Sequence, residues 1–532
     1  MKKAPPVFHP LLNALIPALA LYVQNAYKLK LLDVLPSIAF ILLAAGLLWV
    51  VIQRSLKNLR KSGLVVSVLC LLFFAYGHVI ASITFLAKRY LQVDLEAAFS
   101  SHYYAYSLLL LALWLALFAA TWALTRLARS DFVLVTQFMN VVALVLAGLT
   151  IFRAFQVYDY YRGMQTETAS PAGSLAELSQ LSSLAPVTAG SRPDIYYIIL
   201  DGYARADILA DLYAYDNSAF LAELEALGFY VAEQSSANYM MTVLSLASSL
   251  NLGYLEAVVE RIGTESVNPA PMIALIQDSL LLRALEGWGY KSLAFATGYS
   301  ATEMRQVDVF LSPRLALNGY QNELINLTPF RVLLNGIQYE QHRQTIRYTF
   351  EQLPAIAADD QPTFTFAHLM LPHPPFVFDA EGRAVNPAMD FSIADGSHLT
   401  GLTGMEAYVA AYREQLIYLN QQILSMLGEI LSQSDQPPLI ILQADHGPGS
   451  RLNYESLQDS YLPERLAILN AIYFPGGDYQ LLYPSLTPVN TFRIVLDQYF
   501  GAQLGLLADK NYFSTMSQPY RLFEVTGALA QP

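Results

Sequence analysis

Three residues in the C-terminal part of the chain have the types and positions expected of a metal site. Asp201 follows the apolar run 194–200, and Asp445 and His446 follow the apolar run 439–444. Such side chains are poor continuations of an apolar strand unless something compensates their lost hydration, and a divalent cation commonly does so. A single aspartate after a strand is more often the cap of the next helix. The joint placement therefore carries the prediction of a metal site.

A fourth residue, Thr242, is a candidate nucleophile. It opens the segment 242–250, in which leucines alternate with small residues, so we expect it at or near a helix N-terminus. The free N–H groups and positive dipole end found there suit a phosphate or an oxyanion. A threonine hydroxyl is a weak nucleophile at neutral pH, and coordination to a divalent metal would activate it. The alternative is a plain helix N-cap, which is the commoner role on the residues alone.

These residues need a sheet that brings them together. The short runs 194–200, 363–369 and 439–444 are rich in β-branched and aromatic residues and predict strands. Helical patterns at 217–227 and 412–431 separate them, so the sheet is expected to be largely parallel. Ligands of open α/β sheets gather beyond the carboxyl ends of the strands. We therefore expect the candidate residues to converge at one edge of the sheet.

The composition places another large part of the chain in a membrane. Of 532 residues, 54% are hydrophobic and only 14% are charged, whereas a soluble globular protein carries about 25% charged residues. Disordered, collagen-like and disulfide-rich classes are excluded. The single cysteine, Cys70, lies in an apolar run, so it provides neither an intrachain disulfide nor an exposed nucleophile.

Five apolar stretches in the first 160 residues predict about five transmembrane helices. They lie at roughly 11–27, 34–53, 64–87, 105–125 and 132–155. The last four reach the length of about 20 residues that a membrane span needs. The first contains Pro17 and has some features of a signal peptide, with Ala20 as a cleavage point, but the apolar runs that follow favour a retained span. Buried helices of a large soluble core are the disfavoured alternative.

The charges predict the orientation in the membrane. With the N-terminus inside, the inner segments carry eight lysines and arginines and the short outer loops carry four, in agreement with the positive-inside rule. The chain after residue 155 then emerges on the outer face. Residues 161–532 carry 18 basic and 38 acidic side chains without basic runs, which argues against nucleic acid as a partner.

Three parts of the chain follow from these observations. Residues 1–160 are expected to form a helical membrane domain. Residues 161–192, rich in Ser, Ala, Thr, Gly and Pro, are expected to form a linker. Residues 193–532 are expected to form an α/β extracytoplasmic domain around a largely parallel central sheet. The protein is thus predicted to be an integral, multi-pass protein of the cell membrane.

The order of several motifs resembles the alkaline phosphatase and sulfatase superfamily. The motifs are PDIYYIILDGYARADIL, SANYMMTVLSLASSLN, HLMLPHPPFVFD, LIILQADHG, ERLAILNAIYFPG and TPVNTFRIVLDQYFG. The membrane spans before them resemble those of lipoteichoic acid synthases and phosphoethanolamine transferases. The resemblance implies an alkaline phosphatase-like fold for the outer domain.

By position, the resemblance also implies roles for individual residues. It implies that Asp201, Thr242, Asp445 and His446 are metal ligands and that Thr242 is also the nucleophile. His373 matches a histidine that contacts the transferred phosphoryl group or a second metal. For the same electrostatic role, the weaker candidates are His368 and Arg205.

Two departures from the family pattern limit the chemistry. Sulfatases proper convert a cysteine to formylglycine, but Cys70 lies in a predicted membrane span, which excludes that cofactor. Members with two zinc ions place a further histidine after the DHG motif, and none follows His446 here. The expectation is therefore one divalent ion, Mn²⁺, Mg²⁺ or Zn²⁺, without a full second metal site.

The predicted function is a metal-dependent transferase. It would move a phospho-alcohol head group from a membrane lipid to an envelope acceptor through a phospho-threonine intermediate. The first alternative is a phosphate or sulfate ester hydrolase of the same fold, which shares the first half of the reaction. The second is a non-catalytic envelope scaffold, which has no need of a cation and a nucleophile in one place.

Overall fold

A computed structural model describes residues 5–26, 31–91, 103–167, 192–314, 317–356, 361–387 and 389–527. The chain forms two compact units, here called the membrane unit and the catalytic unit after the roles expected from the sequence. The membrane unit comprises Met1–Gly163, Leu317–Gln338 and Ala388–Asp390, and the catalytic unit comprises Met164–Ala316, Tyr339–Pro387 and Phe391–Pro532. Most of the predicted linker 161–192 lies outside the described residues.

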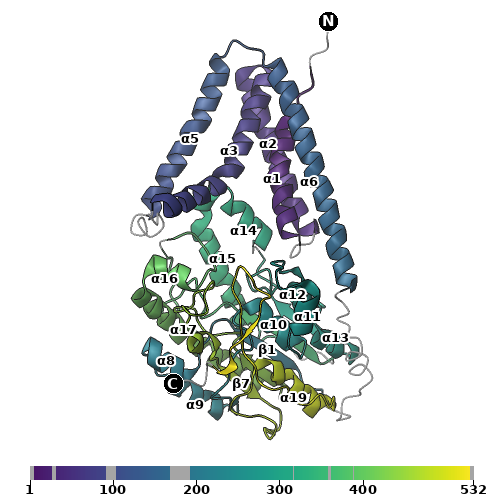
Figure 1. The fold of residues 1–532 in the computed structure, drawn as a ribbon, viewed down its shortest axis with the longest axis vertical. Helices are drawn as coiled ribbons and strands as arrows, with labels where there is room; N and C mark the ends of the chain where they lie inside the picture. The colour runs from purple at the N-terminus through teal and green to yellow at the C-terminus, as the bar shows by residue number, and fades with distance from the viewer. Residues whose placement is uncertain are drawn as a thin grey trace. The chain divides into compact units, whose positions relative to one another are not determined.

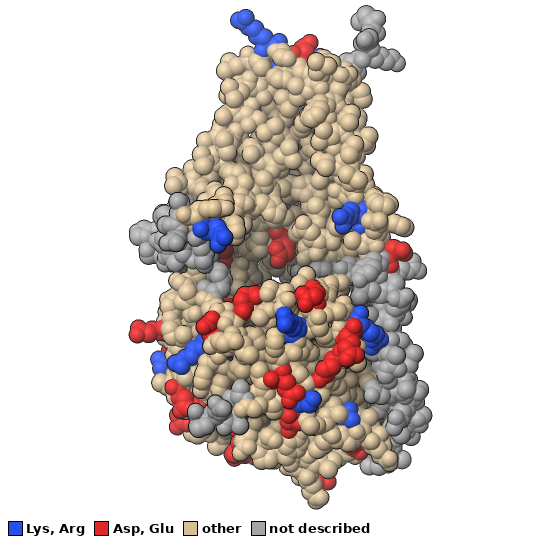
Figure 2. All heavy atoms as spheres, viewed as in Figure 1, with Lys and Arg blue, Asp and Glu red and all other residues tan. Residues whose placement is uncertain are grey.

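Long apolar helices form most of the membrane unit (Figure 1). They are α1 (His9–Asn25), α2 (Leu31–Leu56), α3 (Leu59–Leu86) with the π-helical η1 (Ala87–Leu91), α5 (Tyr103–Leu127) and α6 (Val133–Glu167). Within the described residues, four segments are long and apolar enough to span a membrane: Val34–Leu56, Leu59–Leu86, Leu108–Leu127 and Val133–Asp159. Lysine, arginine, aspartate and glutamate are almost absent from the flank of these helices (Figure 2).

The first predicted span differs from the other four. The structure has a helix there, but α1 is only 17 residues long and contains Pro17. Proline lacks a backbone N–H and interrupts the hydrogen bonding of a helix. In the part of the chain that the structure describes, four segments rather than five therefore have spanning length, and α1 packs against α2 and α3.

A segment from far along the chain belongs to the membrane unit. It carries α14 (Gly319–Asn326), which contacts α1 and α2. The Tyr320 hydroxyl donates a hydrogen bond to the Ala18 carbonyl at 3.0 Å, and the backbone N–H of Gly77 in α3 donates to the Leu327 carbonyl at 3.0 Å. A Cβ atom at position 77 would lie 2.4 Å from the Asn326 carbonyl oxygen. Glycine is therefore what allows the segment to approach α3 so closely.

The catalytic unit is built on a seven-stranded sheet in the order β2-β7-β6-β1-β5-β3-β4. The central β1 pairs in parallel with β5 and β6, and β7 runs antiparallel to β6. The strands are β1 (Ile195–Leu200), β2 (Tyr230–Val231), β3 (Lys291–Phe295), β4 (Val309–Leu311), β5 (Thr363–Leu369), β6 (Leu439–Gln443) and β7 (Asn470–Tyr473), with a separate pair of β8 (Tyr512–Phe513) and β9 (Phe523–Glu524). The predicted largely parallel sheet is confirmed.

Helices surround this sheet, as seen around β1 in Figure 1. All residues of β1, β5 and β6 are buried, which explains why these strands are continuous apolar runs in the sequence. One face packs against a hydrophobic core formed with α10, α12, α13 and α19, whereas α8 and α9 pack against α17. The helices are α8 (Ala206–Tyr213), α9 (Ser218–Ala226), α10 (Thr242–Leu250), α11 (Glu256–Ile262), α12 (Ala270–Gln277), α13 (Leu280–Gly287), α15 (Phe330–Gln352), α16 (Ser397–Thr403), α17 (Met405–Gln433), α18 (Leu462–Leu466) and α19 (Pro488–Phe500). The helical patterns at 217–227 and 412–431 correspond to α9 and α17.

Candidate metal centre

Asp201, Asp445 and His446 meet at the carboxyl ends of two neighbouring strands. Ile199 of β1 lies opposite Gln443 of β6 in the parallel register, so Asp201 and Asp445 leave their strands at the same level. One ligand atom from each of the three side chains lies within 4.8 Å of the others, and all three residues are buried. The predicted convergence at one sheet edge is what the structure shows.

The hydrogen bonds of His446 fix which ring nitrogen faces the cluster. Its Nδ1 lies 2.9 Å from the Gly447 carbonyl oxygen, so Nδ1 carries the hydrogen and donates. Nε2 then presents its lone pair to the two carboxylates, 3.2 Å from Oδ2 of Asp445 and 3.7 Å from Oδ1 of Asp201. This is the tautomer that can bind a metal through Nε2.

Thr242 is the first residue of α10, and its side chain joins this cluster. Its Oγ1 lies 2.9 Å from Nε2 of His446, and since Nε2 has no hydrogen, the threonine hydroxyl donates. The N-cap position is occupied by Met241 rather than Thr242, so Thr242 is not the plain N-cap. One turn later, the Ser245 hydroxyl donates to the Asp445 carbonyl at 2.7 Å, which fastens α10 to the end of β6.

The electrostatics of the cluster favour a cation. Burial and the neighbouring Asp201 raise the pKa of Asp445 to about 7. Burial alone would raise the pKa of Asp201 too, but the nearby His373 and the hydrogen bond from His368 hold this pKa below its usual value. Oδ1 of Asp201 and Oδ2 of Asp445 are buried without a hydrogen-bond partner among the described residues. Two unpartnered carboxylate oxygens beside an imidazole lone pair fit a divalent cation.

Two further histidines surround Asp201. His368 lies in β5, with Nε2 3.1 Å from Oδ2 of Asp201 and Nδ1 2.9 Å from Oγ1 of Thr302. It contacts the carboxylate from outside the cluster and so orients it. The His373 backbone N–H donates to the Asp201 carbonyl at 3.0 Å, and the His373 ring centroid lies 6.5 Å from that of His446. Both predicted histidines therefore lie at the site.

Residues 193–499 match the family described as Sulfatase, and this stretch is more than half of the chain. The chain belongs to the sulfatase family. It is therefore an enzyme of the phosphotransferase or hydrolase type, attached to apolar helices of spanning length. Its fold class and family are those expected from the sequence.

Several solved structures are similar to this member of the sulfatase family. The integral membrane lipooligosaccharide phosphoethanolamine transferase A from Neisseria meningitidis is 13% identical, with 92% of this chain and 93% of that chain covered and a TM-score of 0.40. The periplasmic domain of EptC from Escherichia coli is 11% identical over 64% of this chain and 95% of that chain, with a TM-score of 0.40. The corresponding domain of the phosphoethanolamine transferase EptC from Campylobacter jejuni is 13% identical over 58% and 89%, with a TM-score of 0.36. No curated protein matches the chain.

One predicted residue lies apart from the cluster in this sulfatase-family chain. The Arg205 guanidinium pairs with the Asp207 carboxylate through two hydrogen bonds of 2.8 and 2.7 Å and donates to the Ser235 carbonyl at 3.1 Å. Among the described residues, no contact joins it to the four candidate ligands. The single cysteine, Cys70, lies in α3 and is buried, whereas the candidate nucleophile at position 242 is a threonine. The cysteine that sulfatases proper convert to formylglycine is therefore not present at this position.

Arg465 is a site residue that the sequence analysis missed. Its guanidinium is only 2% exposed, and NH2 lies 3.0 Å from Nε2 of His446. The other contacts are to the Met240 and Gly447 carbonyls, the Asp395 carboxylate and the Tyr454 hydroxyl. All five N–H groups are thus engaged. One of them donates to the Nε2 lone pair of His446, so a cation that binds Nε2 would replace this hydrogen bond. The signal for Arg465 in the sequence was a charged residue within the apolar run that precedes β7.

The glycine of the DHG motif is needed for this arrangement. A Cβ atom at Gly447 would lie 2.1 Å from the Glu464 carbonyl oxygen. The Gly447 N–H also donates to the Arg465 carbonyl at 2.7 Å. The close approach of these two backbone segments brings the Arg465 guanidinium to His446.

Proposed function

We propose that the protein transfers a phospho-alcohol head group from a membrane phospholipid to an acceptor in the cell envelope, with Thr242 as nucleophile. The observation that supports this most is the position of the Thr242 hydroxyl, 2.9 Å from Nε2 of His446 and beside two carboxylates with unpartnered oxygens. Thr242 is half-buried, so substrate can reach it. We place the catalytic residues, within 193–532, on the extracytoplasmic side of the membrane.

Asp201, Thr242, Asp445 and His446 are the residues that would hold one divalent ion, Mn²⁺, Mg²⁺ or Zn²⁺. When bound, such an ion lowers the pKa of a coordinated hydroxyl and neutralises charge on a phosphoryl group. In the first half-reaction, the Thr242 oxygen forms a bond to phosphorus as the bond from phosphorus to the diacylglycerol oxygen breaks. The hydroxyl proton of Thr242 passes to water, and the diacylglycerol oxygen takes up a proton from water as it departs, so the step releases no net proton.

In the second half-reaction, an acceptor hydroxyl attacks the phospho-threonine and restores Thr242. The fixed positive charge of Arg465 lies beside Thr242 and His446 throughout, where it can stabilise the negative charge that the phosphoryl group develops. His373 lies near enough for the same role. Water in place of the acceptor would make the enzyme a hydrolase.

Membrane attachment supports a lipid donor. Four apolar helices of spanning length carry the chain into the bilayer, where phospholipids are the abundant phosphodiesters. A phospholipid reaches such an enzyme by diffusion in the plane of the membrane. A lipid substrate therefore explains why the enzyme has membrane helices, whereas a soluble ester substrate would not.

The test uses the full chain in vesicles of phosphatidylethanolamine or phosphatidylglycerol with Mn²⁺, Mg²⁺ or Zn²⁺. We expect diacylglycerol release by mass spectrometry and, without an acceptor, a head-group phosphate adduct on Thr242. Thr242→Ala should reduce release at least about 10⁴-fold, since loss of a nucleophile costs about 10⁶ in one serine enzyme. The matched control is Thr400→Ala in α16, which lies outside the cluster and should act as wild type. Wild-type release by Thr242→Ala would exclude the covalent mechanism, and turnover of soluble esters alone would show a hydrolase.

A further inference from the structure

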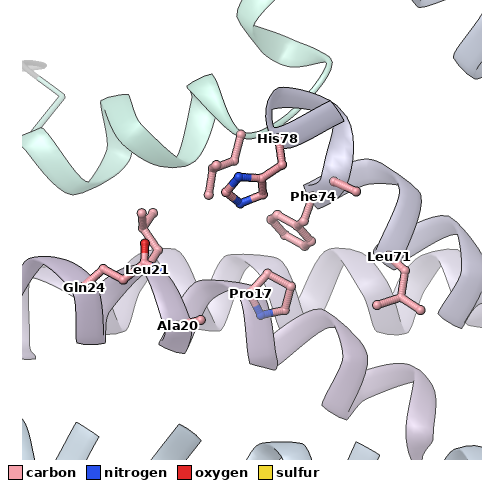
Figure 3. Close-up of a pocket in the computed structure, with 9 residues that line it drawn as sticks. Pro17, Ala20, Leu21, Gln24, Leu71, Phe74 and His78 are labelled. Atoms are coloured by element: carbon pink, nitrogen blue, oxygen red, sulfur yellow. The ribbon is translucent and has the colours of Figure 1, made fainter. Parts of the chain in front are cut away.

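The membrane unit contains a groove of about 240 Å³ between α1 and α3 (Figure 3). Each helix lines it with one face. The face of α1 includes Pro17, Ala20 and Gln24, and that of α3 includes Phe74, Ala75 and His78. The α1 positions are three, four or seven residues apart, and in α3 the adjacent Phe74 and Ala75 lie four and three residues before His78, as one helical face requires. The small alanines in the middle of both faces leave the space that forms the groove.

The two polar side chains of the groove lie toward one end of each helix. Gln24 and His78 are the last lining residues of α1 and α3 in chain order. In Figure 3 both sets of lining residues run in the same direction, so the polar residues follow the apolar ones on both helices. Both residues are exposed, and neither has a hydrogen-bond partner among the described residues.

The polar end of the groove lies toward the end of a spanning segment. Leu59–Leu86 has 28 residues, about 42 Å at 1.5 Å per residue, which exceeds a hydrocarbon core of about 30 Å. His78 lies eight residues before the end of this segment and Gln24 one residue before the end of α1, so both lie toward the head-group region. Phosphate and ester oxygens of phospholipids provide hydrogen-bond acceptors there.

The far wall of the groove is Leu327, the residue after α14. The Gly77 N–H donates a hydrogen bond to the Leu327 carbonyl at 3.0 Å. The absence of a side chain at Gly77 allows the two backbone segments to lie this close. The residue that precedes His78 therefore fixes the wall against which a bound molecule would lie. The groove is a product of two membrane helices and one segment from far along the chain.

We propose that this groove binds a membrane phospholipid, with one acyl chain along Pro17, Ala20 and Ala75 and the phosphate against Gln24 and His78. Water does not suit the space, because a buried water needs two to four polar partners and the walls are apolar except at one end. The carboxamide and imidazole N–H groups are donors, whereas phosphate and ester oxygens are acceptors. Among the described residues that line the groove there is no carboxylate to repel a phosphate. The inference does not depend on the proposed function, because binding at this site involves no turnover.

The test is photo-crosslinking of the full chain in phosphatidylcholine nanodiscs with a phosphatidylethanolamine that carries a diazirine in one acyl chain. Mass spectrometry of the digested protein should locate the label in the α1 and α3 peptides that line the groove. Ala20→Phe and, separately, Ala75→Phe should abolish this label by filling the groove. Ala116→Phe on the lipid-exposed face of α5 should not. Label that persists in both groove variants would overturn the proposal.

A second comparison tests the phosphate contact. The double variant Gln24→Leu with His78→Leu should lose the phospholipid label but keep that of a diazirine diacylglycerol, which has no phosphate. Gln137→Leu, an exposed polar residue of α6, is the matched control and should label as wild type with both probes. Equal labelling of wild type and double variant by the phospholipid would show that Gln24 and His78 do not bind its phosphate. Gel filtration and melting temperature would confirm that each variant is folded.

Discussion

In the membrane unit, the Asn140 carboxamide of α6 accepts hydrogen bonds from the backbone N–H groups of Phe8 and His9 at 3.3 and 3.1 Å, and it donates to the Pro6 carbonyl at 2.7 Å. It thus caps α1, whose own N-cap residue offers no side-chain acceptor. In the catalytic unit, by contrast, Asp201 and Asp445 bury carboxylate oxygens that no described residue partners. Both units bury some uncharged polar atoms without a partner among the described residues, for example Asn13 Nδ2 and Thr136 Oγ1 in the membrane unit, but the unpartnered carboxylate oxygens lie in the catalytic unit.

The difference follows from what surrounds each unit. Hydrocarbon offers no hydrogen bonds, so polar backbone groups of membrane helices must find partners within the protein. In the catalytic unit, the buried carboxylates of Asp201 and Asp445 have lost their hydration at the ends of β1 and β6. A bound cation can offset that energetic cost. Unsatisfied charge there is a sign of binding, and exposed His78 is its counterpart in the membrane unit.

The largest expected effect comes from removing one of the unsatisfied charges. Asp445→Asn should abolish diacylglycerol release and the thermal stabilisation by divalent metal, which amounts to about 2.7 kcal/mol at a hundredfold excess over Kd. Titration calorimetry and melting curves with Mn²⁺ would measure this. Asp459→Asn, an exposed aspartate, is the control and should behave as wild type. Unchanged metal binding by Asp445→Asn would place the cation elsewhere.

Arg465→Lys should reduce turnover by about 10² to 10³, the usual cost of losing one well-placed electrostatic donor. Lysine keeps the charge but cannot reproduce the five contacts of the buried guanidinium. Metal binding should persist, because Arg465 is not a ligand. Arg451→Lys provides the matched control, since that side chain stacks on Tyr461 and lies outside the cluster. Full activity of Arg465→Lys would remove the residue from the proposed mechanism.

Metal affinity should depend on pH through Asp445. Because the metal-free site raises the pKa of this carboxyl from 3.8 to about 7, metal must displace a proton below pH 7. Affinity should rise about tenfold per pH unit up to pH 7 and then level off. The pKa of Asp445 is higher in the folded than in the unfolded state. The free energy of unfolding of the metal-free protein should therefore fall as pH rises from about 4 to 7, because Asp445 loses its proton over this range. Calorimetry in buffers of different ionisation enthalpy counts the released proton, and an affinity independent of pH would contradict the shift.

Two glycines test the close approaches in each unit. Gly77→Ala and Gly447→Ala would place a Cβ atom 2.4 and 2.1 Å from a backbone oxygen, so each should lower stability by about 1–3 kcal/mol. Only Gly447→Ala should also impair turnover, because it displaces Arg465 from His446. Gly428→Ala in α17 meets nothing within 4 Å and should be neutral or slightly stabilising. Equal loss of turnover in both variants would contradict the separation of the two units' roles.

The smallest effect is expected for Arg205→Ala. Its ion pair with Asp207 is partly exposed, and such pairs contribute about 0–1 kcal/mol. Turnover should change by less than about fivefold, the rate equivalent of that energy. A larger loss, measured by the same diacylglycerol assay, would show that Arg205 reaches the substrate after all.

The sequence by itself predicted the apolar helices, the central strands and the convergence of Asp201, Asp445 and His446. Local periodicity and the residue after each strand suffice for these, because burial on both faces makes a strand uniformly apolar and parallel strands end at a common edge. The role of Thr242 as a ligand came only from the family resemblance. For α1, the apolar composition of residues 11–27 predicted a membrane span, but the helix has only 17 residues.

Only the tertiary structure decided that β6 lies next to β1 in matching register, that Arg465 reaches His446 and that Leu327 meets Gly77. Each of these contacts depends on strand order or on backbone approach between distant segments. Hydrophobic periodicity shows which face of a helix or strand is buried. It does not show which distant helix or strand packs against that face.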